Sequence, residues 1–110
     1  MKVSVDQPRA NINRIVLDGR LDVAGTQAAD AEFNAALASA NGVIVDLSMV
    51  PFIASLGIRL LVAGAQTCTK AGGKMVLMGP DELSRRVLKT TGIDQLVQVA
   101  TDLDEALASF

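Results

Sequence analysis

The stretch VIVDLSMVPFIASLGIRLL at residues 43–61 decides the fold of this chain. Residues 43–47 form a largely apolar, β-branched run, which is typical of a central strand covered on both faces. Pro51 ends the strand soon afterwards, because proline cannot donate a hydrogen bond to a sheet. Ser55 then opens a segment whose apolar residues recur at helical spacing as far as Lys70. The stretch therefore predicts a buried strand followed by an amphipathic helix.

The same alternation continues on both sides of this unit. Further strands are expected at residues 3–5, 12–18, 74–78 and 96–99, and further helices at 24–40 and 80–91. A capping box of Thr101 and Asp104 predicts the start of a last helix. Strands that alternate with helices through short loops require a largely parallel sheet. The prediction is a single α/β domain over residues 1–110, a mostly parallel central sheet with an antiparallel N-terminal strand and about four helices.

Composition excludes most catalytic chemistry. The 110 residues contain no His, no Trp, no Tyr and a single Cys, so a Ser-His-Asp triad, a Cys-His pair and a His-rich zinc site cannot form. We therefore expect no enzymatic activity, no catalytic residue, no metal site and no cofactor. With 50% hydrophobic but only 3% aromatic residues, the core should be aliphatic.

Charge and hydropathy argue against two further classes of partner. A net charge of -2 has the wrong sign for binding a phosphate backbone, so no nucleic-acid partner is expected. No apolar run reaches the roughly 18 to 20 residues that a membrane span needs, and the N-terminus lacks the apolar segment of a signal peptide. The sequence predicts a soluble, cytoplasmic protein.

In sheets of this kind, functional residues usually lie in the loops where strands end and helices begin. Two loops meet this description, at residues 19–22 and 50–57. Ser55 in the second loop has two readings: an N-cap worth about 1 kcal/mol, which spacing alone favours, or a hydroxyl that carries a phosphate at the positive end of a helix. Asp22 in the first loop either bonds nearby backbone, or orients Ser55 or a metal ion on the nucleotide of a partner.

Residues 43–48 and 50–61 resemble the signature of bacterial anti-sigma factor antagonists, a group within the STAS domain family that also includes sulfate-transporter tails. Residues 19–22 (Gly-Arg-Leu-Asp) are similar to that family's Gly-Glu-Leu-Asp turn. Gly72-Gly73 before a strand and Thr91-Gly92-Ile93 after a helix also fit. The resemblance covers nearly the whole chain and implies the STAS fold.

The resemblance also implies a function. In this family an anti-sigma factor serine kinase phosphorylates a serine that corresponds to Ser55, and a PP2C-type serine phosphatase is the expected opposing enzyme. The unmodified protein binds the kinase and so frees a sigma factor, whereas the phosphorylated protein is released. The residues expected to contact the kinase are Asp22, Leu56, Gly57, Arg59 and Leu60.

Two positions depart from the family pattern. Ala54 stands where an Asp usually precedes the serine, and Leu56 stands where a second hydroxyl usually follows it. These departures keep an alternative open: a scaffold subunit of the same fold that is never phosphorylated and belongs to an ATP-binding-cassette transporter or a signalling assembly.

Overall fold

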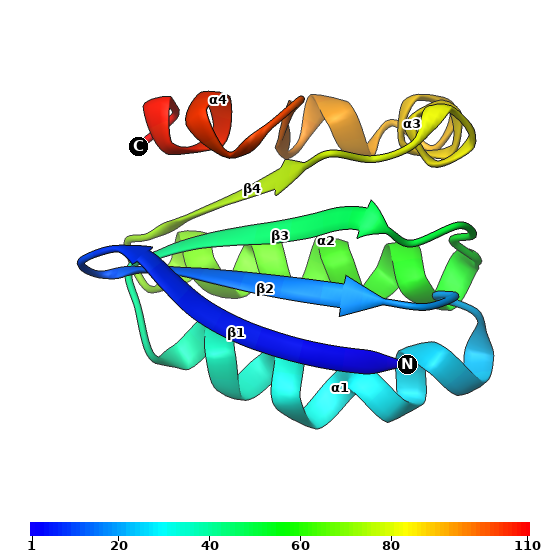
Figure 1. The fold of residues 1–110 in the computed structure, drawn as a ribbon, viewed down its shortest axis with the longest axis horizontal. Helices are drawn as coiled ribbons and strands as arrows, with labels where there is room; N and C mark the ends of the chain where they lie inside the picture. Colours follow the sequence, from blue (N-terminus) through cyan, green and yellow to red (C-terminus); the bar gives the residue numbers. More distant parts are fainter.

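A five-stranded sheet with the strand order β1-β2-β3-β4-β5 forms the centre of the computed structural model, which describes residues 1–110 (Figure 1). β1 pairs with β2 antiparallel, and the remaining pairs are parallel. This confirms the predicted fold and element order. The strands are β1 (Lys2–Arg9), β2 (Ile12–Asp18), β3 (Gly42–Met49), β4 (Lys74–Met78) and β5 (Gln98–Ala100). The helices are α1 (Val23–Ala38), α2 (Ser55–Lys70), α3 (Glu82–Thr90) and α4 (Leu103–Ala108), with a 3-10 turn η1 (Ile93–Gln95).

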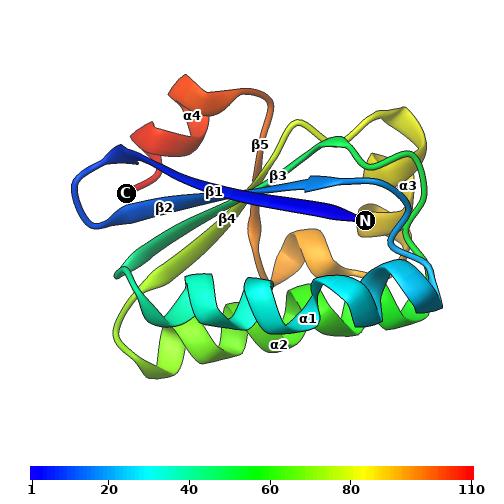
Figure 2. The same ribbon diagram turned by 60° about the horizontal axis from the view of Figure 1, so that its bottom comes forward.

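Helices α1 and α2 cover one face of the sheet, and α4 packs on the other face against β4 and β5 (Figure 2). The larger core cluster has 20 buried residues and includes Phe33 of α1, which is fully buried. α1 and α2 approach closely at Gly64, where a Cβ atom would lie 2.8 Å from both the Phe33 ring and the Met75 methyl group. The small residues of α2 therefore make room for the one large ring of an otherwise mostly aliphatic core.

The structure corrects three details of the sequence prediction. β1 is longer than residues 3–5, because it pairs with β2 as far as Arg9. The last strand begins at Gln98 rather than at residue 96, because the chain forms η1 after Gly92. The last helix is capped by Asp102, which accepts from the Glu105 amide at 2.9 Å, so the predicted capping box was one residue out of register.

β1 and β2 are joined by a bidentate ion pair. The Arg14 Nε and Nη2 atoms donate to both carboxylate oxygens of Asp6 at 2.9 and 2.6 Å. This hydrogen bonding holds the pKa of Asp6 below its ordinary value of 3.8. A carboxyl whose pKa is lower in the folded state stabilises the fold above the unfolded-state pKa, and that stabilisation is lost as the pH falls through the folded-state value.

Acidification should therefore affect the wild type and an Asp6→Asn variant differently. We expect the stability advantage of the wild type over Asp6→Asn to shrink as the pH falls below 3.8. Because the Asp6 side chain is 51% exposed, the advantage should not exceed about 1 kcal/mol. Urea unfolding of both proteins at pH 6 and at about pH 2.5 measures it. An advantage that stays constant between the two pH values would contradict the role given to this ion pair.

Candidate functional site

The two loops that the sequence singled out lie side by side at the carboxyl ends of β2 and β3. The Leu21 amide donates to the Phe52 carbonyl at 2.8 Å, and the Ala54 amide donates to the Leu21 carbonyl at 2.9 Å. Leu21 and Ile53 form an isolated parallel bridge. This pairing places the start of α1 beside the start of α2. Asp22 in the first loop and Ser55 in the second therefore both lie close to the paired backbone.

Two glycines allow this close approach. A Cβ atom at Gly57 would lie 2.9 Å from both Leu21 Cβ and the Leu21 carbonyl oxygen. A Cβ atom at Gly25 would lie 1.9 Å from the Arg20 carbonyl oxygen. Gly57 was predicted to contact a partner, but it is buried. Its place in the structure is underneath the site, where it sets the distance between the loops.

Ser55 is the first residue of α2 and not its cap. The N-cap position belongs to Ala54, whose side chain makes no capping hydrogen bond, so the N-cap reading of Ser55 is wrong. Ser55 is exposed, and its hydroxyl makes no hydrogen bond within the chain. The amides of Ser55, Leu56 and Gly57 also lack backbone partners, because the first helical bond runs from Ile58 to Ala54. The first turn of α2 thus keeps backbone donors that have no acceptor within the chain.

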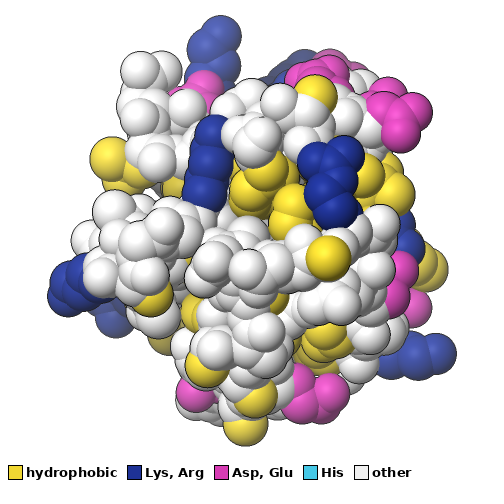
Figure 3. Space-filling view, turned by 90° about the vertical axis from the view of Figure 1, so that its left-hand side faces the viewer, with side chains coloured by type: hydrophobic (Ala, Val, Ile, Leu, Met, Phe, Trp, Pro, Cys, Tyr) yellow, Lys and Arg dark blue, Asp and Glu magenta, His cyan; other side chains and the backbone are white.

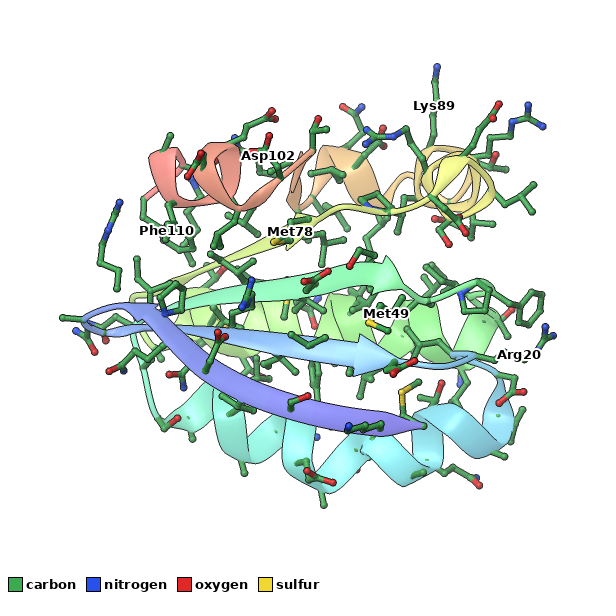
Figure 4. The ribbon with its side chains drawn as sticks, viewed as in Figure 1. Arg20, Met49, Met78, Lys89, Asp102 and Phe110 are labelled. Carbon is green, nitrogen blue, oxygen red and sulfur yellow. The ribbon has the colours of Figure 1, made fainter.

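Asp22 caps the neighbouring helix. Its Oδ1 atom accepts from the Gly25 amide at 2.8 Å, and its Oδ2 atom lies 3.6 Å from Arg20 Nε. The Arg20 guanidinium in turn lies over the Phe52 ring, 4.4 Å from its centroid. Figure 4 shows Arg20 and Met49 at this end of the sheet. Asp22 therefore has the local structural role that the sequence left open as one of its two readings. The Arg20–Phe52 contact was not anticipated.

Replacing Asp22 by Ala is expected to destabilise the protein by about 1 kcal/mol, because the Gly25 amide loses its capping acceptor. Asp22→Asn is the matched control, since its side-chain oxygen can accept the same hydrogen bond without the charge. Thermal or urea unfolding of both variants measures the difference. Equal losses in the two variants would show that the charge of Asp22 matters rather than the cap.

A groove of about 420 Å³ runs between α1 and α2. Leu56, Arg59 and Leu60, which the sequence predicted as partner contacts, line its α2 wall together with Ala63. Arg59 forms no ion pair, and Leu60 is only 8% exposed. The α1 wall is polar and was not anticipated. It consists of Thr26, Gln27, Asp30 and Asn34.

The sequence does indicate that residues 27, 30 and 34 of the α1 wall share one helix face, because they recur at helical spacing. That spacing cannot reveal which neighbouring helix the stripe faces. Thr26 beneath it is buried with an unpartnered hydroxyl. Ser55 lies in a different hollow, which it lines together with Phe52, Ile58, Val87 and Thr91. The first turn of α2 therefore separates the groove from the serine.

Other parts of the molecule offer less chemistry. No group of three His, Cys, Asp or Glu side chains is placed to hold a metal ion, and no helix is both long and apolar enough to cross a membrane. Burial raises the pKa of the Cys68 thiol, which disfavours the reactive thiolate. The opposite end of the sheet shows hydrophobic side chains between Lys and Arg side chains (Figure 3). The hollow at that end is lined by Gly42, Gly73 and Phe110, but both glycine amides are bonded to carbonyls and cannot bind an anion.

Comparison with known proteins agrees with this architecture. The family model of the STAS domain matches residues 5–106. An anti-sigma factor antagonist from Mycobacterium paratuberculosis is 25% identical, with a TM-score of 0.88 over 98% of this chain and 92% of that chain. The Bacillus cell fate determinant SpoIIAA in its phosphorylated form is 20% identical, with a TM-score of 0.73 over 98% of both chains. A sulfate transporter family protein from Wolinella succinogenes is 18% identical, with a TM-score of 0.80 over 94% of this chain and 88% of that chain.

The last two similarities show a shared fold, since their identities are low. No curated protein sequence matches the chain. The family model, however, matches residues 5–106 and so spans nearly all of the sequence. The chain belongs to the STAS domain family.

Proposed function

We propose that this protein is an anti-sigma factor antagonist that binds an anti-sigma factor serine kinase and is released when the kinase phosphorylates Ser55. The observation that carries the proposal is the exposed, unbonded Ser55 hydroxyl at the start of α2, beside three backbone amides without partners. The protein acts here as a substrate and a binding partner, not as a catalyst. In the transfer step the Ser55 oxygen attacks the γ-phosphorus of ATP, ADP leaves, and the hydroxyl proton passes to a base of the kinase.

The start of α2 suits a phosphate in the free protein. The first turn of α2 contains no acidic side chain, and the unpaired amides of residues 55–57 can donate to phosphate oxygens. Attraction between an anion and a helix N-terminus contributes about 0.3 to 1 kcal/mol at an exposed site. Phosphorylation should therefore leave the free protein folded, and its energetic cost falls on the complex.

The proposed docking surface includes the groove between α1 and α2 and the loops next to it. Leu56, Leu60 and Ala63 supply apolar contacts there, and the unpaired Arg59 supplies a positive charge at the edge. Asp22 adds a partly exposed carboxylate at the start of α1. Ser55 lies across the first turn of α2 from the groove, next to the loops of this surface. A new dianion at Ser55 would therefore stand at the margin of the interface, where it must lose water.

Incubation with the cognate kinase and ATP is expected to add one phosphate, and Ser55→Ala is expected to abolish the labelling. Ser48→Ala is the matched control, because Ser48 is also exposed in this region but its hydroxyl already donates to Asp46 Oδ1 at 2.6 Å. Intact-mass spectrometry measures the change, and a PP2C-type serine phosphatase should reverse it. Labelling that persists in Ser55→Ala would refute the assignment of the site.

A scaffold role within a transporter or a signalling assembly is the second candidate. Ala54 favours it, because no carboxylate stands directly before Ser55 to assist phosphoryl transfer. On this alternative, the protein copurifies with an ATP-binding-cassette subunit and never carries phosphate in its native cell. Mass spectrometry of the protein from cells that lack the kinase or the phosphatase distinguishes the two candidates.

A further inference from the structure

Strand β1 is an open edge of the sheet. It lies at the end of the strand order and pairs only with β2. Helix α1 contacts it, but no strand is drawn on its other side in Figures 1 and 2. Six of its eight residues are exposed. None of the backbone hydrogen bonds outside the helices and strands involves residues 2–8. An edge strand of this length presents unpaired amides and carbonyls that another strand can bind.

We infer that the partner for this edge is a second copy of the chain, paired antiparallel through β1 about a two-fold axis at Ser4. In this register Lys2 of one copy stands opposite Asp6 of the other, and Val3 stands opposite Val5. Each pair occurs twice because the interface is isologous. The edge is therefore complementary to itself in both charge and apolar contact.

Side-chain directions agree with this register. Lys2, Ser4 and Asp6 alternate with Val3 and Val5, so the charged pairs lie on one face of the extended sheet and the valines on the other. Lys2 forms no ion pair within its own chain. Asp6 already accepts from Arg14, but its side chain is 51% exposed and has room for a further donor. Val5 is 47% exposed in the single chain and would be covered.

Other registers lose these contacts. Moving the axis by one residue to Val5 places Lys2 opposite Pro8, which has no amide to donate, and moving it to Val3 places Lys2 opposite Ser4. The strand pairing with β2 also becomes irregular between Asp6 and Arg9, which limits a regular edge to residues 2–6. Only the register centred on Ser4 brings opposite charges together. The contact is small, so we expect a transient dimer that forms at high protein concentration.

Charge reversal in the full chain tests the pairing. Sedimentation equilibrium of the wild type should show concentration-dependent dimers that weaken as salt is added. K2E alone and D6K alone each create two repulsive pairs and should weaken association about tenfold, because each cross-strand charge pair contributes about 0.2 to 1 kcal/mol. An equimolar mixture of K2E and D6K should restore it, because both cross pairs in the heterodimer are attractive. Thermal unfolding checks that D6K, which loses the Arg14 ion pair, remains folded.

Disulfide trapping tests the register independently. Two thiols introduced by Ser4→Cys would face each other across the axis and should form an intermolecular disulfide under mild oxidation. Gln7→Cys is the matched control, because its two thiols would lie at opposite ends of the paired segment. The native Cys68 is buried and does not compete. A wild type that stays monomeric at the highest soluble concentration, equal trapping of both variants, or no restoration in the charge-reversal mixture would overturn the inference.

Discussion

Phosphorylation of Ser55 is expected to weaken binding to the anti-sigma kinase by about 2 to 4 kcal/mol, or about 30- to 1000-fold. The effect should be large because the phosphate adds about 1.5 to 2 negative charges near pH 7. In the free protein those charges face open amides and solvent at the start of α2. In the complex they must lose water beside an apolar surface.

Calorimetric titration of the kinase with phosphorylated and unmodified protein measures this loss. Ser55→Asp should reproduce part of it, since a carboxylate carries less charge than a phosphate. Ser55→Ala is the control that removes the hydroxyl without adding charge, and it should bind as the wild type does. Both variants should keep the thermal midpoint of the wild type, because Ser55 caps no helix. Unfolding of either variant, or equal kinase affinity of both, would contradict the electrostatic switch.

Replacing Phe33 by Ala is expected to lower the free energy of unfolding by about 3 to 5 kcal/mol. Phe33 is fully buried where α1 meets α2, and Gly64 packs directly against its ring. The facing residue of α2 is a glycine, which has no side chain that could move into the space. The loss is a large share of the roughly 5 to 15 kcal/mol that stabilises a typical domain.

Phe52→Ala is the matched control for this prediction. The same atoms are removed, but Phe52 is 40% exposed. Its ring is covered by the guanidinium of Arg20, which is itself exposed. Its loss should therefore stay near 1 kcal/mol. Urea unfolding monitored by circular dichroism compares the two variants. Similar losses at both positions would show that the α1–α2 contact is less tightly packed than the structure indicates.

The sequence was sufficient for the elements and their order, because their causes are local. The apolar run of residues 43–47 and the helical stripe after Ser55 each bury one continuous surface, and strands alternating with helices leave few topologies. The predicted boundaries of the last strand and the last helix were less accurate. There, the residues around Gly92 form η1, and Asp102 competes with Thr101 as the cap.

The sequence alone also identified Ser55 and the loops at residues 19–22 and 50–57 as candidates for the site. It placed Leu56, Arg59 and Leu60 on one helix. Only the tertiary structure decided how the site is built. The hydrogen bonds between Leu21 and the loop of Phe52 and Ala54 join segments about thirty residues apart, so no local spacing encodes them. By fixing Ala54 in an extended conformation with φ -94° and ψ 175°, the loop makes it the N-cap and leaves the Ser55 hydroxyl free. Side-chain preferences describe which residues can cap a helix, whereas the path of the backbone determines which residue does.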